Sequence, residues 1–294
     1  MGGLKSKTQE HGLKKSISIW SFYGSWNLDE KMKLAKAAGF EGFEIDLSED
    51  GPVALKSSAE DLKKVRASAE KAGIALSGLA TGLYWGANGA SADASVRAKA
   101  AAILTRQIEC AAALGLDAIL VVPATVGADF IPGCEVVPYD QAMLRAKELV
   151  KAALPAAEKH KVTLGIENVW NKFLVSPLEM RDFIDSFGSE RVGAYFDTGN
   201  SLAWGYPEHW ISILGKRIVR VHFKDYRRAV GNVEGFVDLL SGNVNWPAVM
   251  AALRQVGYSG WCTAEMIPPV PFYTHAPEVL IHNTARAMDS IFKL

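Results

Sequence analysis

The chain has few cysteines, no excess of charge of either sign and no long apolar run. Its three cysteines, Cys110, Cys134 and Cys262, form no CxxC pair, which argues against a disulfide framework and against a thiolate zinc site. The 32 basic and 32 acidic residues give a formal net charge of zero, so no whole-protein field attracts nucleic acid. We therefore expect no nucleic-acid partner.

Membrane and nucleotide signatures are missing as well. No apolar stretch approaches the roughly 18 to 20 residues that span a bilayer. Residues 1–15 are polar and basic and lack the apolar segment of a signal peptide. Neither GxGxxG after the first predicted strand nor GxxxxGK[ST] occurs, so the usual phosphate cradles of open nucleotide-binding sheets are absent. The sequence predicts a cytoplasmic protein with no membrane partner.

Strand-like and helix-like patterns alternate along the chain. The first unit is a strand at 16–21 and a helix at 29–38 that Gly39 ends, and a second strand follows at 42–46. Later strands are expected at 74–79, 116–122, 162–167, 192–197, 218–222 and 261–265, and helices at 58–72, 93–114, 139–160, 177–187, 208–214, 246–256 and 276–292. Eight such units predict the α/β class and a single (β/α)8 TIM barrel over residues 15–294, behind a flexible tail at 1–14. A doubly wound open sheet is the alternative.

Four residues of metal-ligand type each end one of these predicted strands: Glu167, Asp197, His222 and Glu265. The carboxyl ends of parallel barrel strands meet at one mouth, so we expect the four side chains to converge there. Taken singly, Asp197 could be explained as a cap of the next helix and nothing more, and His222 as a hydrogen-bonded core histidine. Taken together, three carboxylates and one imidazole favour a site for Mn²⁺, Mg²⁺, Co²⁺ or a similar divalent ion.

The motifs around these residues resemble the xylose-isomerase-like sugar isomerase and epimerase superfamily. They read Ile166-Glu167-Asn168, Phe196-Asp197-Thr198-Gly199-Asn200, Val221-His222-Phe223-Lys224-Asp225 and Thr263-Ala264-Glu265. Within the superfamily, the chain is similar to ketose 3-epimerases and to L-ribulose or L-xylulose 5-phosphate 3-epimerases over nearly its whole length. The resemblance implies one divalent metal ion, Mn²⁺ in the first place and otherwise Mg²⁺, Co²⁺ or Zn²⁺, held by the four strand-end residues. It also implies a homodimer or homotetramer.

The implied activity is inversion of C3 in a ketose or ketose phosphate through an enediolate. A proton on carbon next to a ketone is weakly acidic, and a divalent ion would stabilise the charge left by its removal. The resemblance assigns Glu167 and Glu265 as the acid/base pair, one acting on each face of the carbon. Alternatives on the same barrel are an aldose-ketose or hydroxypyruvate-type isomerase and an inosose dehydratase. A sugar-binding protein without chemistry is the non-enzyme alternative.

The resemblance also indicates substrate contacts. The resemblance places Glu44 at the end of the second strand, two residues before the end of the strand predicted at 42–46, because relatives carry an acidic residue near the site there. A strand-end carboxylate bonded to a loop is the alternative. Arg228 lies six residues after His222, where sugar epimerases place an arginine, although Arg227 competes for that role. Asn200 takes the position of a histidine that holds the sugar in free-ketose epimerases.

Tryptophans follow several of the predicted strands. Trp20 and Trp204 are expected to stack on the apolar face of a sugar, and Trp85 and Trp170 are further candidates. Simple loop packing is the alternative for each ring.

The chain departs from the free-ketose pattern near the predicted site. Residues 171–174 lack a glutamate that those enzymes carry, and the run from Asp197 to Trp204 is closer to the pentulose-phosphate epimerases. A phosphate would find candidate sites in the amides of 82–89 or in the basic pair 227–228. Lys224 and Asp225 are expected to pair with each other, with contact to a phosphate as the alternative. The long segment 230–245 is expected to form a lid or a subunit contact.

Overall fold

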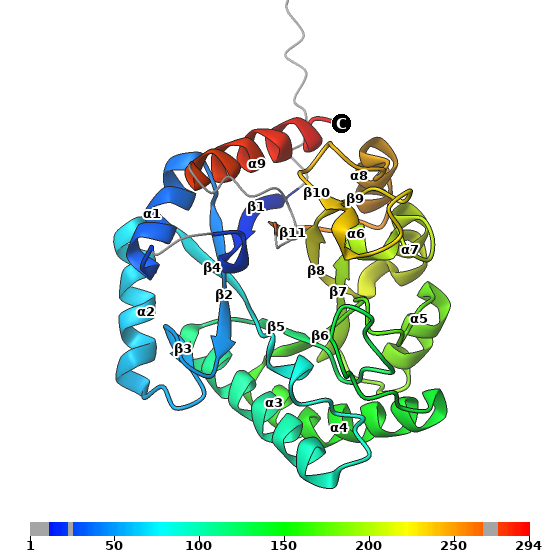
Figure 1. Ribbon diagram of the computed structural model, residues 1–294. Helices are drawn as coiled ribbons and strands as arrows, with labels where there is room; N and C mark the ends of the chain where they lie inside the picture. The colour runs from blue at the N-terminus through cyan, green and yellow to red at the C-terminus, as the bar shows by residue number, and fades with distance from the viewer. Residues whose placement is uncertain (1–11, 23–25, 267–275) are drawn as a thin grey trace, which may run out of the picture.

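A closed parallel barrel surrounded by helices forms the body of the protein (Figure 1). The computed structural model describes residues 12–22, 26–266 and 276–294. The barrel strands are β1 (Leu13–Ser18), β2 (Gly42–Ser48), β4 (Ala75–Ala80), β5 (Ala118–Val121), β6 (Thr163–Glu167), β7 (Val192–Asp197), β8 (Ile218–Phe223) and β11 (Gly260–Ala264). They pair in the order β1-β11-β8-β7-β6-β5-β4-β2, and β1 also pairs with β2, which closes the ring. The predicted (β/α)8 barrel is confirmed.

Helices cover the outside of the barrel between successive strands (Figure 1). They are α1 (Leu28–Ala38), α2 (Ala59–Ala72), α3 (Ala94–Leu114), α4 (Tyr139–His160), α5 (Pro177–Asp185), α7 (Pro207–Leu214), α8 (Trp246–Gln255) and α9 (Pro277–Ile291). The short α6 (Thr198–Ser201) is buried and directly follows β7 at the mouth of the barrel. Short 3₁₀ turns occur at Ile19–Ser21, Leu83–Trp85, Gly215–Arg217 and Val233–Gly235. In the described ranges, no helix is both long and apolar enough to cross a membrane.

Local sequence signals account for many of these boundaries. Ser58 and Asp61 form a reciprocal capping box that starts α2, because each side chain accepts a hydrogen bond from the other's backbone N–H. Gly39 ends α1 in the left-handed region, at φ 99°, which glycine adopts without a steric penalty. The start of α2 and the end of α1 thus lie where the sequence predicts them.

The first strand differs from the prediction. β1 begins at Leu13, ahead of the predicted domain boundary at residue 15, and ends at Ser18, where the side chain caps a 3₁₀ turn. The predicted strand over 16–21 was therefore placed too late. Residues 1–11, which make up most of the predicted tail, lie outside the described residues.

Short strands at the mouth were not predicted. β3 (Val53–Ala54) adds to the end of β2, and β9 (Asp225–Tyr226) pairs antiparallel with β10 (Phe236–Val237). The β9–β10 ribbon folds the long segment 230–245 back onto the barrel. Asp225 fixes this fold, since its carboxylate accepts hydrogen bonds from Leu240 N, Val244 N and Trp246 Nε1.

Candidate metal centre

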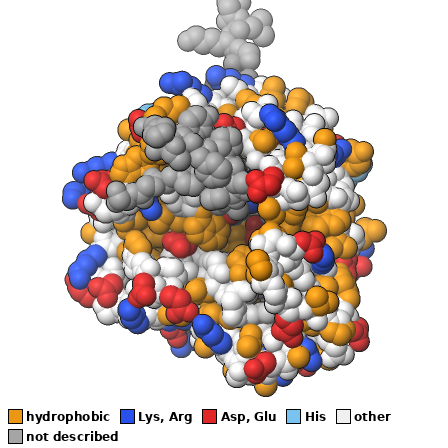
Figure 2. All heavy atoms as spheres, viewed as in Figure 1, with side chains coloured by type: hydrophobic (Ala, Val, Ile, Leu, Met, Phe, Trp, Pro, Cys, Tyr) orange, Lys and Arg blue, Asp and Glu red, His pale blue; other side chains and the backbone are white. Residues whose placement is uncertain are grey.

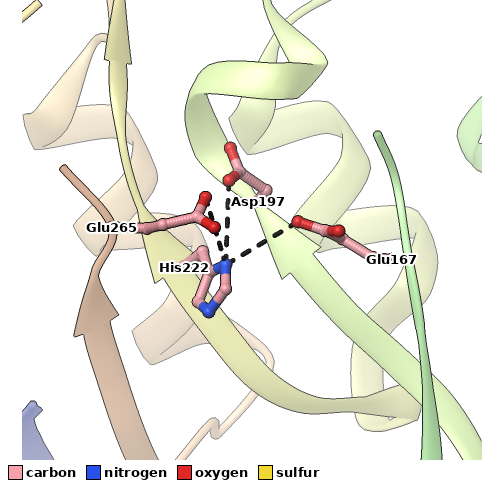
Figure 3. A group of neighbouring side chains, drawn as sticks. All are labelled: Glu167, Asp197, His222 and Glu265. Carbon is pink, nitrogen blue, oxygen red and sulfur yellow. Dashed lines mark ion pairs between the residues drawn. The ribbon is translucent and has the colours of Figure 1, made fainter. Parts of the chain in front are cut away.

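Four neighbouring barrel strands bring the predicted ligands together. Glu167 ends β6, Asp197 ends β7, His222 lies in β8 and Glu265 directly follows β11. One ligand atom from each residue lies within 4.8 Å of the other three, and all four residues are buried. Glu167 and Glu265 approach the imidazole from opposite sides (Figure 3). The predicted convergence of these side chains is thus what the structure shows.

The spacing of the cluster suits a shared cation. His222 Nδ1 lies 3.7 Å from Glu167 Oε1, 3.9 Å from Asp197 Oδ2 and 3.6 Å from Glu265 Oε2. These distances are too long for hydrogen bonds, and Nδ1 has no hydrogen-bond partner among the described residues. Two bonds of about 2.1 Å to one ion place their donor atoms roughly 3 to 3.5 Å apart. A small inward movement of the side chains would therefore let all four donors reach one ion.

The opposite nitrogen of His222 is held by Glu44. His222 Nε2 lies 3.0 Å from both carboxylate oxygens of Glu44, which also accepts a short hydrogen bond from the Tyr195 hydroxyl. Glu44 is fully buried beneath the cluster, and the prediction that it ends its strand is wrong because β2 continues to Ser48. Such a carboxylate fixes the ring orientation and leaves Nδ1 free to bind a metal.

Asp197 serves as a helix cap and as a candidate ligand at once. Its Oδ1 accepts a hydrogen bond of 2.7 Å from the backbone N–H of Asn200 at the start of α6, while Oδ2 faces His222. Asn168 clamps the same residue, donating to Asp197 O at 2.9 Å and accepting from Asp197 N at 2.8 Å. The two interpretations of Asp197 left open by the sequence therefore apply to different oxygens.

Asn200 lies behind the cluster. Its Nδ2 is 3.5 Å from Glu167 Oε1, and its Oδ1 is 3.5 Å from Lys224 Nζ. The residue is buried in α6, which follows β7, and its amide contacts both Glu167 and Lys224.

Lys224 lies in the cluster, where the sequence analysis did not place it. Its buried ammonium group lies 3.3 Å from Asp197 Oδ2 and forms a short ion pair with Glu265 Oε2. The predicted pairing with Asp225 is wrong, since Asp225 instead accepts hydrogen bonds from the segment that follows it. The strand period offered a signal, because residues two apart on a strand point to the same face and Lys224 comes two residues after His222.

Burial and neighbouring charges make the two glutamates unequal. Burial raises the pKa of Glu167 to about 7, the charge of Glu265 adds to the rise, and His222 opposes it. Burial would also raise the pKa of Glu265, but the charges of Lys224 and His222 outweigh it and hold that pKa well below its usual range. Burial disfavours the imidazolium of His222, yet Glu44 and Glu265 raise its pKa well above the ordinary value. Both carboxylates thus favour the protonated form of metal-free His222.

A cavity of about 200 Å³ adjoins the cluster. Glu167, Lys224 and Glu265 line it together with Trp20 and Trp85. The space-filling view shows a recess near the middle of this face, bordered by hydrophobic side chains (Figure 2). The structure thus places Trp20 and Trp85 where a small molecule beside the cluster would touch them.

Two predicted substrate contacts lie further out. Trp204 is 43 % exposed and packs on Trp170, with ring centroids 5.9 Å apart, and it is not part of the cavity wall. Arg228 is exposed, donates a hydrogen bond to Gly205 O at 2.9 Å and stacks over Tyr206. The structure does not bring either side chain to the cluster.

Fold and site together define a barrel with a carboxylate and histidine centre at the carboxyl ends of its strands. The chain matches the family described as Xylose isomerase-like TIM barrel over residues 32–286. The protein belongs to this family, as the sequence motifs predict.

Two of the similar proteins described next carry the names of sugar epimerases. The chain is 26 % identical over 251 residues to a protein of Escherichia coli (strain K12) provisionally named L-ribulose-5-phosphate 3-epimerase SgbU, covering 82 % of this chain and 84 % of the relative. A solved structure of D-psicose 3-epimerase in the presence of D-fructose superposes with a TM-score of 0.76 at 19 % identity, covering 94 % and 97 % of the two chains. The IOLI protein, solved with a zinc atom, gives a TM-score of 0.78 at 17 % identity over 95 % and 98 %.

Proposed function

We propose that the protein is a metal-dependent sugar isomerase or epimerase that inverts C3 of a ketose or ketose phosphate. The observation that carries the proposal is the pair Glu167 and Glu265, two carboxylates facing each other across a buried histidine beside a small cavity. Membership of the xylose isomerase-like family and the sugar epimerases among the structural neighbours support it.

One divalent ion fits the centre. Three carboxylate oxygens and the unpartnered Nδ1 of His222 form a mixed oxygen and nitrogen donor set, which suits Mn²⁺ and also Mg²⁺, Co²⁺ or Zn²⁺. The ligands would be Glu167, Asp197, His222 and Glu265, and the zinc atom in the IOLI structure supports a divalent metal. When bound, the ion supplies Lewis-acid stabilisation of the negative charge that develops as the substrate loses a proton.

The protein's own residues would move the proton. Glu167 and Glu265 approach from opposite sides, so one can remove the C3 proton from one face and the other can return a proton to the opposite face. Glu167, with a pKa of about 7, can take up and release a proton near neutral pH. Trp20 and Trp85 would cover the apolar face of the sugar and exclude water from the reacting carbon.

Solvent exchange followed by NMR tests this proposal. The Mn²⁺-loaded protein is incubated in deuterated water with free and phosphorylated pentuloses and hexuloses. We expect deuterium at C3 and none at C1, whereas an aldose-ketose isomerase would exchange hydrogen at C1 and C2. An inosose dehydratase would instead remove a hydroxyl group and create a new absorbance.

Substitution of either glutamate tests the two-base mechanism. Glu167→Gln and Glu265→Gln should each abolish exchange, while Glu60→Gln, on the exposed face of α2, should leave it unchanged. Retained exchange in either site variant would contradict the mechanism. No exchange with any ketose, ketose phosphate or inosose would favour a sugar-binding protein that has kept the barrel without the chemistry.

A further inference from the structure

Lys224 places a positively charged side chain inside the candidate metal centre. Its Nζ contacts Asp197 Oδ2 and Glu265 Oε2. These are the same two oxygen atoms that face His222 Nδ1. A cation bound between the four ligands would therefore share two of its donor atoms with the ammonium group.

The surrounding loop is built to hold this lysine. The Thr198 hydroxyl accepts a hydrogen bond from Lys224 N at 3.1 Å and donates one to Lys224 O at 2.8 Å. A Cβ atom on Gly199 would lie only 2.9 Å from Lys224 Cβ, so only glycine fits where α6 crosses the lysine. The ring of Phe236, from β10, covers Nζ at 4.8 Å from its centroid. Two separate segments, α6 and β10, thus enclose Lys224.

We propose that Lys224 is a positioning residue that acts through Asp197 and Glu265, an inference that rests on the proposed metal site. Its charge balances the charge of the centre and at the same time lowers the affinity for the metal ion. The three carboxylates carry three negative charges, and a divalent ion with neutral His222 cancels two of them. The ammonium group cancels the third. The ion, its four ligands and Lys224 then carry no net charge together, with Glu44 outside this group as the partner of His222 Nε2, so negative charge that develops on a substrate meets no net repulsion from the ligands.

The same ammonium group competes for the electron pairs of its two carboxylate partners. An ion that binds Asp197 Oδ2 and Glu265 Oε2 lies close to a like charge in a buried, weakly screened environment. Removal of the lysine charge should therefore tighten metal binding, although it breaks two ion pairs. A residue that only supported the fold would have the opposite effect, because loss of its contacts would loosen the ligands and weaken binding.

Calorimetric titration of the metal-free full-length protein with Mn²⁺ alone tests the inference, and it requires no knowledge of the substrate. We expect Lys224→Met to lower the Kd for Mn²⁺ at least tenfold. Lys224→Arg, which keeps the charge, should stay within about threefold of the wild type. The matched control is Lys172→Met, which removes a half-exposed lysine paired with Asp129 and should leave the Kd unchanged.

The outcomes separate this inference from the proposed function. A wild-type protein that binds no Mn²⁺ contradicts the metal site and the inference together. Binding by the wild type with an equal or higher Kd in Lys224→Met overturns the inference alone. If the methionine variant does not fold, Lys224→Gln, which keeps a polar end without a charge, should show the same tightening, and an unchanged Kd in that variant would also overturn it.

Discussion

Metal binding should release protons, and the number released should depend on pH. In the metal-free protein the pKa of His222 lies well above its ordinary value, and that of Glu167 is raised to about 7. A metal ligand must be deprotonated, so an ion that enters the centre displaces whatever protons these groups hold. Glu167 is about one-tenth protonated at pH 8 and about nine-tenths protonated at pH 6, from a pKa of about 7.

The expected count follows from these fractions. Glu167 releases about 0.1 proton at pH 8 and about 0.9 at pH 6, in addition to the protons that come from His222. The release from Glu167 should therefore rise by about 0.8 proton between pH 8 and pH 6. The raised pKa of Glu167 also sets the sign for affinity, since binding strengthens as pH rises through 7. Glu167 alone should make Mn²⁺ binding about tenfold tighter at pH 8 than at pH 6.

Calorimetric titration with Mn²⁺ in two buffers of different ionisation enthalpy measures the count. Glu167→Gln is the matched variant, since its amide oxygen can still bind an ion but holds no titrating proton. We expect the count in this variant to lose the rise attributed to Glu167. A wild-type release that is the same at pH 6 and pH 8 would refute the reasoning, because it would mean that Glu167 is already ionised in the metal-free protein.

Two further predictions concern residues that support the centre. Glu44→Gln should weaken Mn²⁺ binding about 10- to 100-fold, because His222 loses the carboxylate that orients its ring; an unchanged Kd would mean that the ring is fixed by packing alone. Gly199→Ala should lower the free energy of unfolding by about 1–3 kcal/mol in chemical denaturation, because the added Cβ meets Lys224 at 2.9 Å. Gly82→Ala is its control, since an added Cβ there has no neighbour within 4 Å among the described residues, and equal stability of the two variants would speak against the close contact.

The sequence predicted the parts of the fold that depend on local signals. The helix over 139–160 and the helix end at Gly39 agree with the structure, because periodic apolar residues and caps act over a few positions. The convergence of Glu167 with Glu265 could also be predicted, since parallel strands of a barrel all end at one mouth. Short strands such as β3 and β10 span two residues each and depend on tertiary pairing, so the sequence carries no periodic signal for them.

The details of the site depend on distances that no sequence pattern encodes. Glu44 and His222 are 178 positions apart, and the register of β2 against β1 and β4 places the carboxylate beneath the imidazole. Likewise, adjacent residues of opposite charge suggested that Lys224 pairs with Asp225. Successive residues of an extended segment point to opposite faces, which directs Lys224 to the ligands and Asp225 to the β9–β10 segment.

The unequal surroundings of Glu167 and Glu265 give a direction to the proposed chemistry. Glu265 forms an ion pair with the ammonium group of Lys224 through Oε2 and lies near His222, so both neighbours favour its ionised form. Among the described residues, no cation lies as close to Glu167 as Lys224 lies to Glu265, and the amide of Asn200 is 3.5 Å from Glu167 Oε1. Enzymes that use two carboxylates separate acid and base by placing them in different environments. Under the proposed function, Glu167 is therefore the group that gains and loses a proton most readily near neutral pH, and exchange through Glu265 requires the substrate or the metal to weaken its pairing with Lys224.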